Sequence, residues 1–247
     1  MNLQHEVEFF DQFGHDHGDY DVLGDHAYGR LLDLLEREVP LSAESRVADL
    51  GCGSGAFTRR LASRVKSSVT GMDLSLGLVS RASERGGRER YVVGDILQSA
   101  LPPASFDAVL YTGVLHHFST AELRIRVLAE GLRILKPGGK TFAYDPSRHS
   151  PSMWLYRDPK SPLYSSKGKT DNEVLLSRDQ LASEAIAAGF VDVKVQSVSG
   201  ITFRYVAGRF ARLMLPLYNV YELAVEVSPL ENRIGTFLVT FGTKAVD

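Results

Sequence analysis

Residues 47–55 have the sequence VADLGCGSG, in which a short apolar run leads into a turn that contains three glycines. The apolar run, residues 46–50, is typical of a buried strand, and residues 56–65 have a helical pattern. Glycines permit tight backbone angles and let a ligand approach the main-chain amides. The spacing is not that of the dinucleotide fingerprint, and nicotinamide and flavin proteins also use glycine-rich turns. The stretch therefore predicts a strand, a ligand-binding turn and a helix.

Strands and helices continue to alternate beyond this turn. Ser119 and Glu122 predict a capping box at the start of a helix over residues 121–135, and Lys136-Pro137-Gly138-Gly139 predicts its end. Short apolar strands that alternate with helices imply parallel pairing with both faces of the sheet covered. The other elements expected here are strands at 68–72, 91–93, 106–111 and 141–144 and a helix from about residue 76.

Two segments interrupt the alternation after residue 145. Residues 146–176 are rich in Pro, Ser, Lys and Arg without a clear period, and residues 200–232 are an apolar insertion. Between them, Ser177 and Gln180 predict a second capping box. The remaining expected elements are helices at 5–13, 26–39 and 177–188 and strands at 190–198 and 236–241.

The composition narrows the class of protein. The chain has 247 residues, which suits one large α/β domain or such a domain with a small lid. A net charge of -2 gives no bulk positive field for nucleic acid or an anionic membrane. The single cysteine, Cys52, excludes an internal disulfide framework and fits a reducing compartment. The N-terminus lacks the pattern of a signal peptide and no apolar run is long enough to span a bilayer, so we expect a cytoplasmic protein.

Two acidic residues follow the second and third expected strands. A carboxylate at Asp73 can accept both hydroxyls of a ribose, and Asp95 beside a backbone amide offers what an adenine edge needs. Open α/β sheets bind ligands at the carboxyl ends of their strands, where these acids and the turn at Gly51 all lie. Asp95 alone could be an ordinary turn residue. Together the three positions predict one adenosine-like ligand.

The run from Val47 to Asp145 closely resembles the core of the class I S-adenosylmethionine-dependent methyltransferases. It looks most like the small-molecule branch that includes the ubiquinone and menaquinone biosynthesis methyltransferases. The resemblance implies a doubly wound, mostly parallel, Rossmann-like sheet of seven strands with an antiparallel last strand. The segments that carry it are VADLGCGSG, VTGMDLS, VVGDI, FDAVLYTGVLHHF and LRILKPGGKTFAYDP.

The same resemblance implies a cofactor site for S-adenosylmethionine. The methionine part of the cofactor is expected at the glycine turn and just past the fourth strand, the ribose at Asp73, and the adenine between Leu74 and the pair at 95–96. The N-terminal Tyr20 resembles a tyrosine that closes over the cofactor. The implied cofactor residues are Tyr20, Asp49, Gly51, Cys52, Gly53, Asp73, Leu74, Asp95, Ile96, Thr112 and Gly113. Cys52 is better interpreted as a small packing residue than as a nucleophile.

His116 and His117 are the candidates for a general base, because they follow the fourth strand and imidazole titrates near neutral pH. The alternative is that one caps the next segment and the other packs under the loop. Tyr144 and Asp145, at the end of the fifth strand, are secondary candidates. The His15, Asp16, His17 and Asp19 group lacks the ligand spacing of a zinc site, so no metal is expected.

The expected organisation is an N-terminal part, residues 1–40, that closes over the cofactor, and a methyltransferase domain, residues 41–247. Residues 147–176 and 200–232 are expected to form a lid over a small-molecule acceptor. Apolar residues at helical spacing from Phe210 to Tyr221 could line a lipophilic pocket, lie on a membrane surface or be ordinary core. Basic residues could hold an acidic acceptor or form a solvated loop: Arg148, Arg157, Lys160, Lys167 and Lys169.

Three functions from different classes follow from this pattern. The favoured one is methyl transfer by in-line displacement to a small molecule, hydrophobic or acidic. A nucleic-acid methyltransferase is disfavoured, because the stretch after the fourth strand lacks the Asn/Asp-Pro-Pro-Tyr/Phe pattern of base-methylating enzymes and the net charge is negative. The third is a cofactor-binding module that transfers no methyl group, as a sensor, a partner subunit or a catalyst of another reaction.

Overall fold

The computed structural model describes residues 8–12, 21–161, 163–164, 172–206 and 208–246. Within them, one seven-stranded sheet has the order β3-β2-β1-β4-β5-β7-β6. Neighbouring strands are parallel from β3 to β5, and β7 lies antiparallel between β5 and β6. This confirms the predicted fold class. The strands are β1 Arg46–Leu50, β2 Ser68–Asp73, β3 Arg90–Val93, β4 Phe106–Thr112, β5 Leu135–Pro146, β6 Val191–Val198 and β7 Phe237–Thr243.

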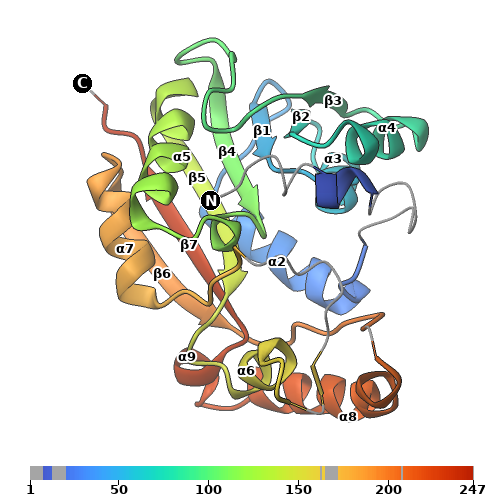
Figure 1. The fold of residues 1–247 in the computed structure, drawn as a ribbon. Helices are drawn as coiled ribbons and strands as arrows, with labels where there is room; N and C mark the ends of the chain where they lie inside the picture. Colours follow the sequence, from blue (N-terminus) through green and yellow to red (C-terminus); the bar gives the residue numbers. More distant parts are fainter. Residues whose placement is uncertain (1–7, 13–20, 162, 165–171, 207, 247) are drawn as a thin grey trace.

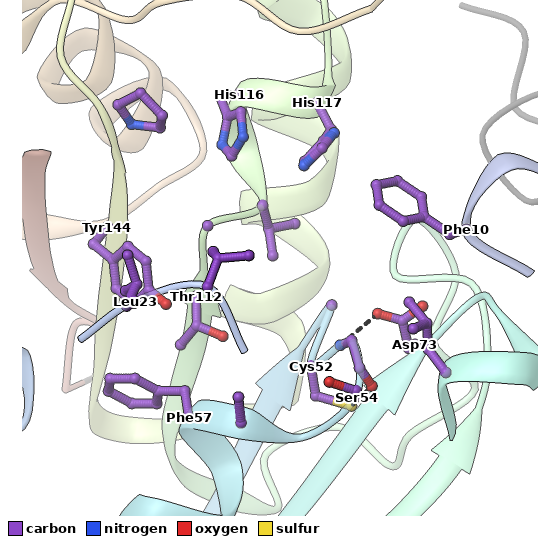
Figure 2. Close-up of a pocket in the computed structure, with 18 of the residues that line it drawn as sticks. Phe10, Leu23, Cys52, Ser54, Phe57, Asp73, Thr112, His116, His117 and Tyr144 are labelled. Atoms are coloured by element: carbon purple, nitrogen blue, oxygen red, sulfur yellow. Dashed lines mark hydrogen bonds between the residues drawn. The ribbon is translucent and has the colours of Figure 1, made fainter. Parts of the chain in front are cut away.

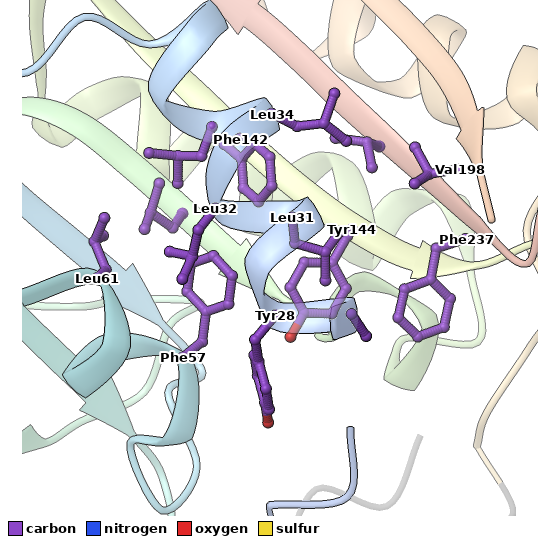
Figure 3. Packing of buried hydrophobic residues seen from close by; sticks show 14 of the residues in the cluster. Tyr28, Leu31, Leu32, Leu34, Phe57, Leu61, Phe142, Tyr144, Val198 and Phe237 are labelled. Atoms are coloured by element: carbon purple, nitrogen blue, oxygen red, sulfur yellow. The ribbon is translucent and has the colours of Figure 1, made fainter. Parts of the chain in front are cut away.

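Helices cover both faces of the sheet (Figure 1). One buried cluster joins α2 and α3 to the sheet, and a second joins α5 and α7 to its other face. Figure 3 shows Leu31 and Leu32 of α2 packed toward Phe57, Phe142 and Tyr144. The helices are α2 Asp25–Glu38, α3 Ala56–Arg64, α4 Leu76–Glu84, α5 Ala121–Ile134, α6 Pro151–Arg157, α7 Arg178–Ala187, α8 Arg209–Glu226 and α9 Glu231–Ile234, with a 3-10 turn, η1, at Leu115–His117.

The two predicted helix caps have different outcomes. The box at Ser177 and Gln180 is present, with each side chain bonded to the other's backbone amide. The box at Ser119 is wrong, because Thr120 is the N-cap of α5 and its hydroxyl accepts from the amide of Leu123. Helical geometry begins only at Ala121, so a hydroxyl at 119 stands one residue too early to reach the free amides.

The fifth strand is longer than predicted. β5 starts at Leu135, directly after α5, so the Pro-Gly-Gly stretch belongs to the strand rather than to a separate terminator. Leu135 pairs with Phe106 of β4, and after an irregularity the register continues from Lys140 opposite Ala108. The long strand places Tyr144 opposite Thr112, the last residue of β4, and carries Asp145 past it, toward the edge where the predicted site lies.

The two insertions hold helices that pack on each other. Residues 146–176 contain α6, which the sequence pattern did not predict; Ser150 caps it by accepting from the amide of Met153. Residues 200–232 contain α8 and the first half of α9. Tyr156 of α6 and Tyr218 of α8 have ring centroids 4.9 Å apart. Among the described residues, no helix combines the length and the apolar character needed to cross a bilayer.

Candidate functional site

A pocket opens at the carboxyl ends of β1, β2, β4 and β5 (Figure 2). Nine of the eleven predicted cofactor residues line it. They are Gly51, Cys52, Gly53, Asp73, Leu74, Asp95, Ile96, Thr112 and Gly113. Residues far apart in the sequence therefore meet in one cavity, as the order of the strands requires.

The glycine turn is held to the end of β2. The Gly51 amide donates to the Met72 carbonyl over 2.7 Å, and the Gly53 amide donates to Asp73 Oδ2 over 2.7 Å. Gly51 has φ +81°, and a side chain there would collide with Val114, which lines the same pocket. Glycine is thus required both by the backbone angle and by the close approach of the next segment.

Asp73 is fixed by backbone amides on both of its oxygens. Oδ1 accepts from the Ser75 amide over 3.0 Å while Oδ2 accepts from Gly53. Burial raises the pKa of Asp73, and the hydrogen bonds from these amides act against that rise. The dashed bond in Figure 2 marks the Gly53 contact. The side chain is a pre-positioned acceptor at the wall of the pocket.

Asp95 serves as a turn residue and lines the pocket as well. Its Oδ1 accepts from the Leu97 amide over 2.8 Å, which is the bond of an Asx turn. Asp95 and Ile96 both face the cavity. The two interpretations offered by the sequence are therefore compatible, since the turn orients the carboxylate.

Asp49 is fully buried behind the wall of the pocket and does not line it. Its Oδ2 accepts from Thr58 over 2.6 Å and its Oδ1 from Thr112 over 3.0 Å. Burial raises the pKa of Asp49 to about 6, against the effect of these two hydroxyls. In this structure Asp49 holds Thr112, which does line the pocket, in place.

Part of the N-terminal prediction lies outside the described residues. Tyr20 lies outside the described residues, and so do the four residues considered for a metal, His15, Asp16, His17 and Asp19. The described part does reach the pocket, because Phe10 and Leu23 line it. Neither of these two residues was predicted.

His116 and Asp145 form a buried pair at the pocket wall. The backbone amide and Nδ1 of His116 lie 3.0 and 2.9 Å from the same atom, Asp145 Oδ1. In the tautomer that carries its hydrogen on Nδ1, the ring donates that hydrogen to Asp145 Oδ1. Burial lowers the pKa of His116 to about 3 and raises the pKa of Asp145. A neutral imidazole protonated on Nδ1 keeps a lone pair on Nε2, which is what a general base needs.

His117 lies next to this pair and close to an ion pair between Arg157 and Glu173. Its ring lies 4.2 Å from that of His116 and 5.4 Å from that of Phe10, between centroids. Burial lowers the pKa of His117, with smaller contributions from His116 and Arg157. Ligand atoms of His116, His117 and Glu173 lie within 4.8 Å of one another, but Arg157 Nη1 is 3.1 Å from Glu173. The guanidinium supplies the positive charge that a metal would bring, so we assign no metal here.

The other end of the pocket is apolar and aromatic, and sequence analysis missed most of it. Tyr144 stacks on Phe237, with centroids 5.4 Å apart, and Phe57 packs on Tyr144 from α3. Segments before and inside the insertions complete the wall. The residues not predicted for this end are Phe57, Phe118, Pro146, Met153, Tyr156, Phe203, Tyr205, Val206 and Phe237.

Of the three alternatives for the stretch from Phe210 to Tyr221, the structure does not show the first, a wall of the pocket. Among the described residues, none of those lining the pocket comes from α8. Tyr218 packs behind the wall on Tyr156 and Phe203, whereas Phe210, Leu213 and Leu217 are exposed. The apolar side of α8 faces solvent because the opposite side is held to the protein by Glu222, whose carboxylate accepts hydrogen bonds from Thr236 and Ser152. The basic cluster also divides: Arg157 lines the pocket, Arg148 and Lys160 are exposed, and Lys167 and Lys169 lie outside the described residues.

Comparison with known proteins identifies the central part of the chain. Residues 48–143 match a family model described as "Methyltransferase domain". The "Probable tRNA methyltransferase 9B" of Mus musculus is 38% identical over 120 residues, which are 48% of this chain and 25% of that protein. The "27-O-demethylrifamycin SV methyltransferase" of Amycolatopsis mediterranei is 34% identical over 122 residues, 47% of this chain and 44% of that protein. The chain therefore spans less than half the length of both relatives.

Structural similarity to a solved protein covers nearly the whole chain. A crystal structure described as an S-adenosylmethionine-dependent methyltransferase, from Thermotoga maritima, superposes with a TM-score of 0.68 over 97% of this chain and 100% of that one, at 23% identity. The domain match agrees with the predicted enzyme class, and the superposition agrees with the predicted fold. The finer resemblance to the ubiquinone and menaquinone branch is not confirmed and stays a prediction.

Proposed function

We propose that this chain, whose residues 48–143 match a methyltransferase-domain model, transfers a methyl group from S-adenosylmethionine to a small and largely apolar acceptor. One observation supports this above the others. A single pocket runs from the polar end at Asp73 and Asp95, past Thr112, to an aromatic end that contains His116. A site for a nucleoside and a site for an acceptor are then continuous, as direct transfer between them requires.

The polar end fits the cofactor. Asp73 presents a fixed carboxylate for ribose hydroxyls, Asp95 and Ile96 border the space for adenine, and Gly51 leaves room where a side chain would intrude. When bound, S-adenosylmethionine supplies a methyl group that its sulfonium already makes electrophilic. The task of these residues is alignment, and such positioning can contribute on the order of 7–11 kcal/mol.

His116 is the proposed general base. Its Nε2 would take the proton of an acceptor hydroxyl or amine as the nucleophilic atom attacks, and Asp145 would stabilise the resulting imidazolium through Nδ1. His116 borders the aromatic end of the pocket, so an acceptor seated there reaches it directly. Asp145 does not itself line the pocket, and we assign it a positioning role.

The apolar end supports an acceptor with an aromatic or aliphatic body. Tyr144, Phe237, Met153 and Phe203 would bury such a body, and the paired Arg157 offers a donor for one polar substituent. A hydrophobic acceptor was one of the two classes expected from the sequence; the other, an acidic one, would depend on Arg157 leaving Glu173. Because Arg157 is already paired with Glu173, the structure favours a hydrophobic acceptor.

One observation favours a second candidate, methylation of tRNA. The relative from Mus musculus is named a tRNA methyltransferase, and it matches 48% of this chain. The net charge of -2 and the apolar, aromatic lining of the acceptor end favour a small molecule instead. We place the activity in the cytoplasm, since the single cysteine, Cys52, is buried and fits a reducing compartment.

The test uses the full chain and cofactor labelled on the methyl group. Calorimetry with S-adenosylmethionine and S-adenosylhomocysteine measures whether the polar end binds them at all. The chain is then incubated with a panel of aromatic and lipophilic alcohols, phenols and amines, and separately with total tRNA. Mass spectrometry that finds label in a small molecule supports the proposal, whereas label in tRNA alone would replace it. Cofactor binding without any labelled product favours a module that transfers no methyl group.

A further inference from the structure

The outward face of α8 is a surface that the proposed methyl transfer does not use. The helix has eighteen residues, all within the described part of the chain, and Figure 1 shows it along one end of the molecule. Its exposed side chains are large and apolar: Leu213 is 71% exposed, Leu217 62% and Val220 64%. Phe210, Leu223 and Val227 continue the same set, and we call these six residues the α8 apolar face.

The charges of α8 are sorted by side. Its two acids point inward, where Glu222 bonds to Thr236 and Ser152 and Glu226 pairs with Arg30 and His26. The charged residues exposed on the helix are Arg209 and Arg212, both in its first turn. The α8 apolar face is therefore bordered by positive charge and by no exposed acid of its own helix.

We propose that the α8 apolar face docks on the surface of an anionic lipid bilayer, with the helix lying in the plane of the membrane. A helix with a wide apolar face and arginines beside it binds at the boundary of headgroups and acyl chains, where the guanidinium groups meet lipid phosphates. Each apolar side chain that enters this layer adds favourable burial, and each arginine adds electrostatic attraction.

The structure disfavours two other roles for α8, as a membrane span and as a docking site for a second copy of this chain. It does not cross the bilayer, because its opposite side is anchored to the protein by Tyr218 and Glu222 and no described helix meets the requirements of a membrane span. A second copy docked on the same face would offer these arginines no exposed carboxylate of α8 to pair with. An anionic surface satisfies both the apolar and the basic residues.

The neighbouring helix extends the apolar surface. Trp154 and Leu155 of α6 are exposed, while Met153 and Tyr156 of the same short helix line the pocket. Tyr156 contacts Tyr218 of α8 directly. The docking face thus adjoins the aromatic end of the pocket.

The experiment measures sedimentation of the full chain with lipid vesicles, without cofactor or acceptor, so its outcome does not depend on the proposed methyl transfer. Vesicles of phosphatidylcholine alone are compared with vesicles that also contain phosphatidylglycerol. We expect binding to the anionic vesicles that weakens with salt. L213Q/L217Q should weaken it about tenfold or more, and R209Q/R212Q should weaken binding to anionic vesicles specifically.

I186Q is the matched control, because Ile186 of α7 is 61% exposed and lies outside the α8 apolar face. It should bind vesicles as the wild type does. All variants change exposed side chains, and circular dichroism verifies that they fold. Failure of the wild type to bind anionic vesicles overturns the proposal, as does full binding by L213Q/L217Q. A wild-type dimer in analytical ultracentrifugation that L213Q/L217Q dissociates, without vesicle binding, identifies the face as a self-association surface and overturns it too.

Discussion

The two ends of the pocket are built by different physical means. At the polar end, backbone amides of Gly53 and Ser75 hold the carboxylate of Asp73, so recognition depends on hydrogen bonds fixed by a turn. At the aromatic end, rings such as Tyr144 and Phe237 stack around one neutral imidazole, His116. The first end selects a ligand by donor and acceptor positions, and the second by burial with one polar group. Substitutions should therefore separate cofactor binding from turnover.

The largest expected effect is on turnover. His116→Gln removes the lone pair of Nε2, and we expect kcat to fall about a thousandfold while the dissociation constant of the cofactor changes only a few-fold. Single-turnover kinetics and calorimetry measure the two quantities. H149Q, at an exposed histidine outside the pocket, is the control.

A substitution of Asp145 tests whether proton transfer depends on the pair that it forms with His116. Asp145→Asn should shift the pH profile of kcat as well as lower it, because the carboxyl group acts through Nδ1 of His116. If H116Q turns over at the wild-type rate, proton transfer lies elsewhere and the aromatic end serves binding alone.

The next largest effect concerns stability, at the buried Asp49. The pKa of Asp49 in the folded chain, about 6, lies above the ordinary value of 3.8, so between these pH values the folded chain holds a proton that the unfolded chain has released. The free energy of unfolding therefore loses a contribution as pH rises through this window. Asp49→Asn should be more stable than the wild type above pH 6, by about 3 kcal/mol, and the gain should shrink toward pH 4.

Urea unfolding of the protein without cofactor, repeated across this pH range, measures the difference. D192N changes an exposed aspartate of β6 and should show no such trend. A gain in stability that is independent of pH would show that Asp49 does not carry the titration.

These polar positions were predictable because the residues that form the polar end lie close in the sequence and at strand ends. Asp73 ends β2, Asp95 follows β3, and parallel register brings these two strand ends next to the turn at Gly51. The aromatic end is assembled from segments far apart, including Phe10, Met153 and Phe203. Their meeting is set by tertiary packing, which no local pattern encodes.

The two insertions show why helical pattern alone misled. α6 has seven residues, too few to establish a period. α8 has a clear apolar stripe, but the stripe faces outward because Glu222 and Tyr218 form the buried side through hydrogen bonds to the core of the protein. Polar residues with buried partners decided the orientation, and those partners lie far away in the sequence.

A smaller effect is expected at the polar end itself. Asp73→Asn keeps one acceptor oxygen but loses the charge and one amide bond, so we expect about thirtyfold weaker cofactor binding. Calorimetry measures it, with D179N at an exposed site of α7 as the control. In contrast to H116Q, saturation with cofactor should restore most of kcat. An affinity equal to that of the wild type would remove Asp73 from the ligand.

The smallest effect is expected at Cys52, which stands in the glycine turn between the two ends. Burial raises the pKa of its thiol, and the negative charges of Asp73 and Asp49 add to that rise, so the thiolate needed for nucleophilic attack is absent at neutral pH. Cys52→Ala should therefore keep kcat and cofactor affinity within about threefold, with a loss of stability from the lost packing of the sulfur. A collapse of kcat at unchanged affinity would mean that the turn supplies chemistry, and the separation of a binding end from a reacting end would fail.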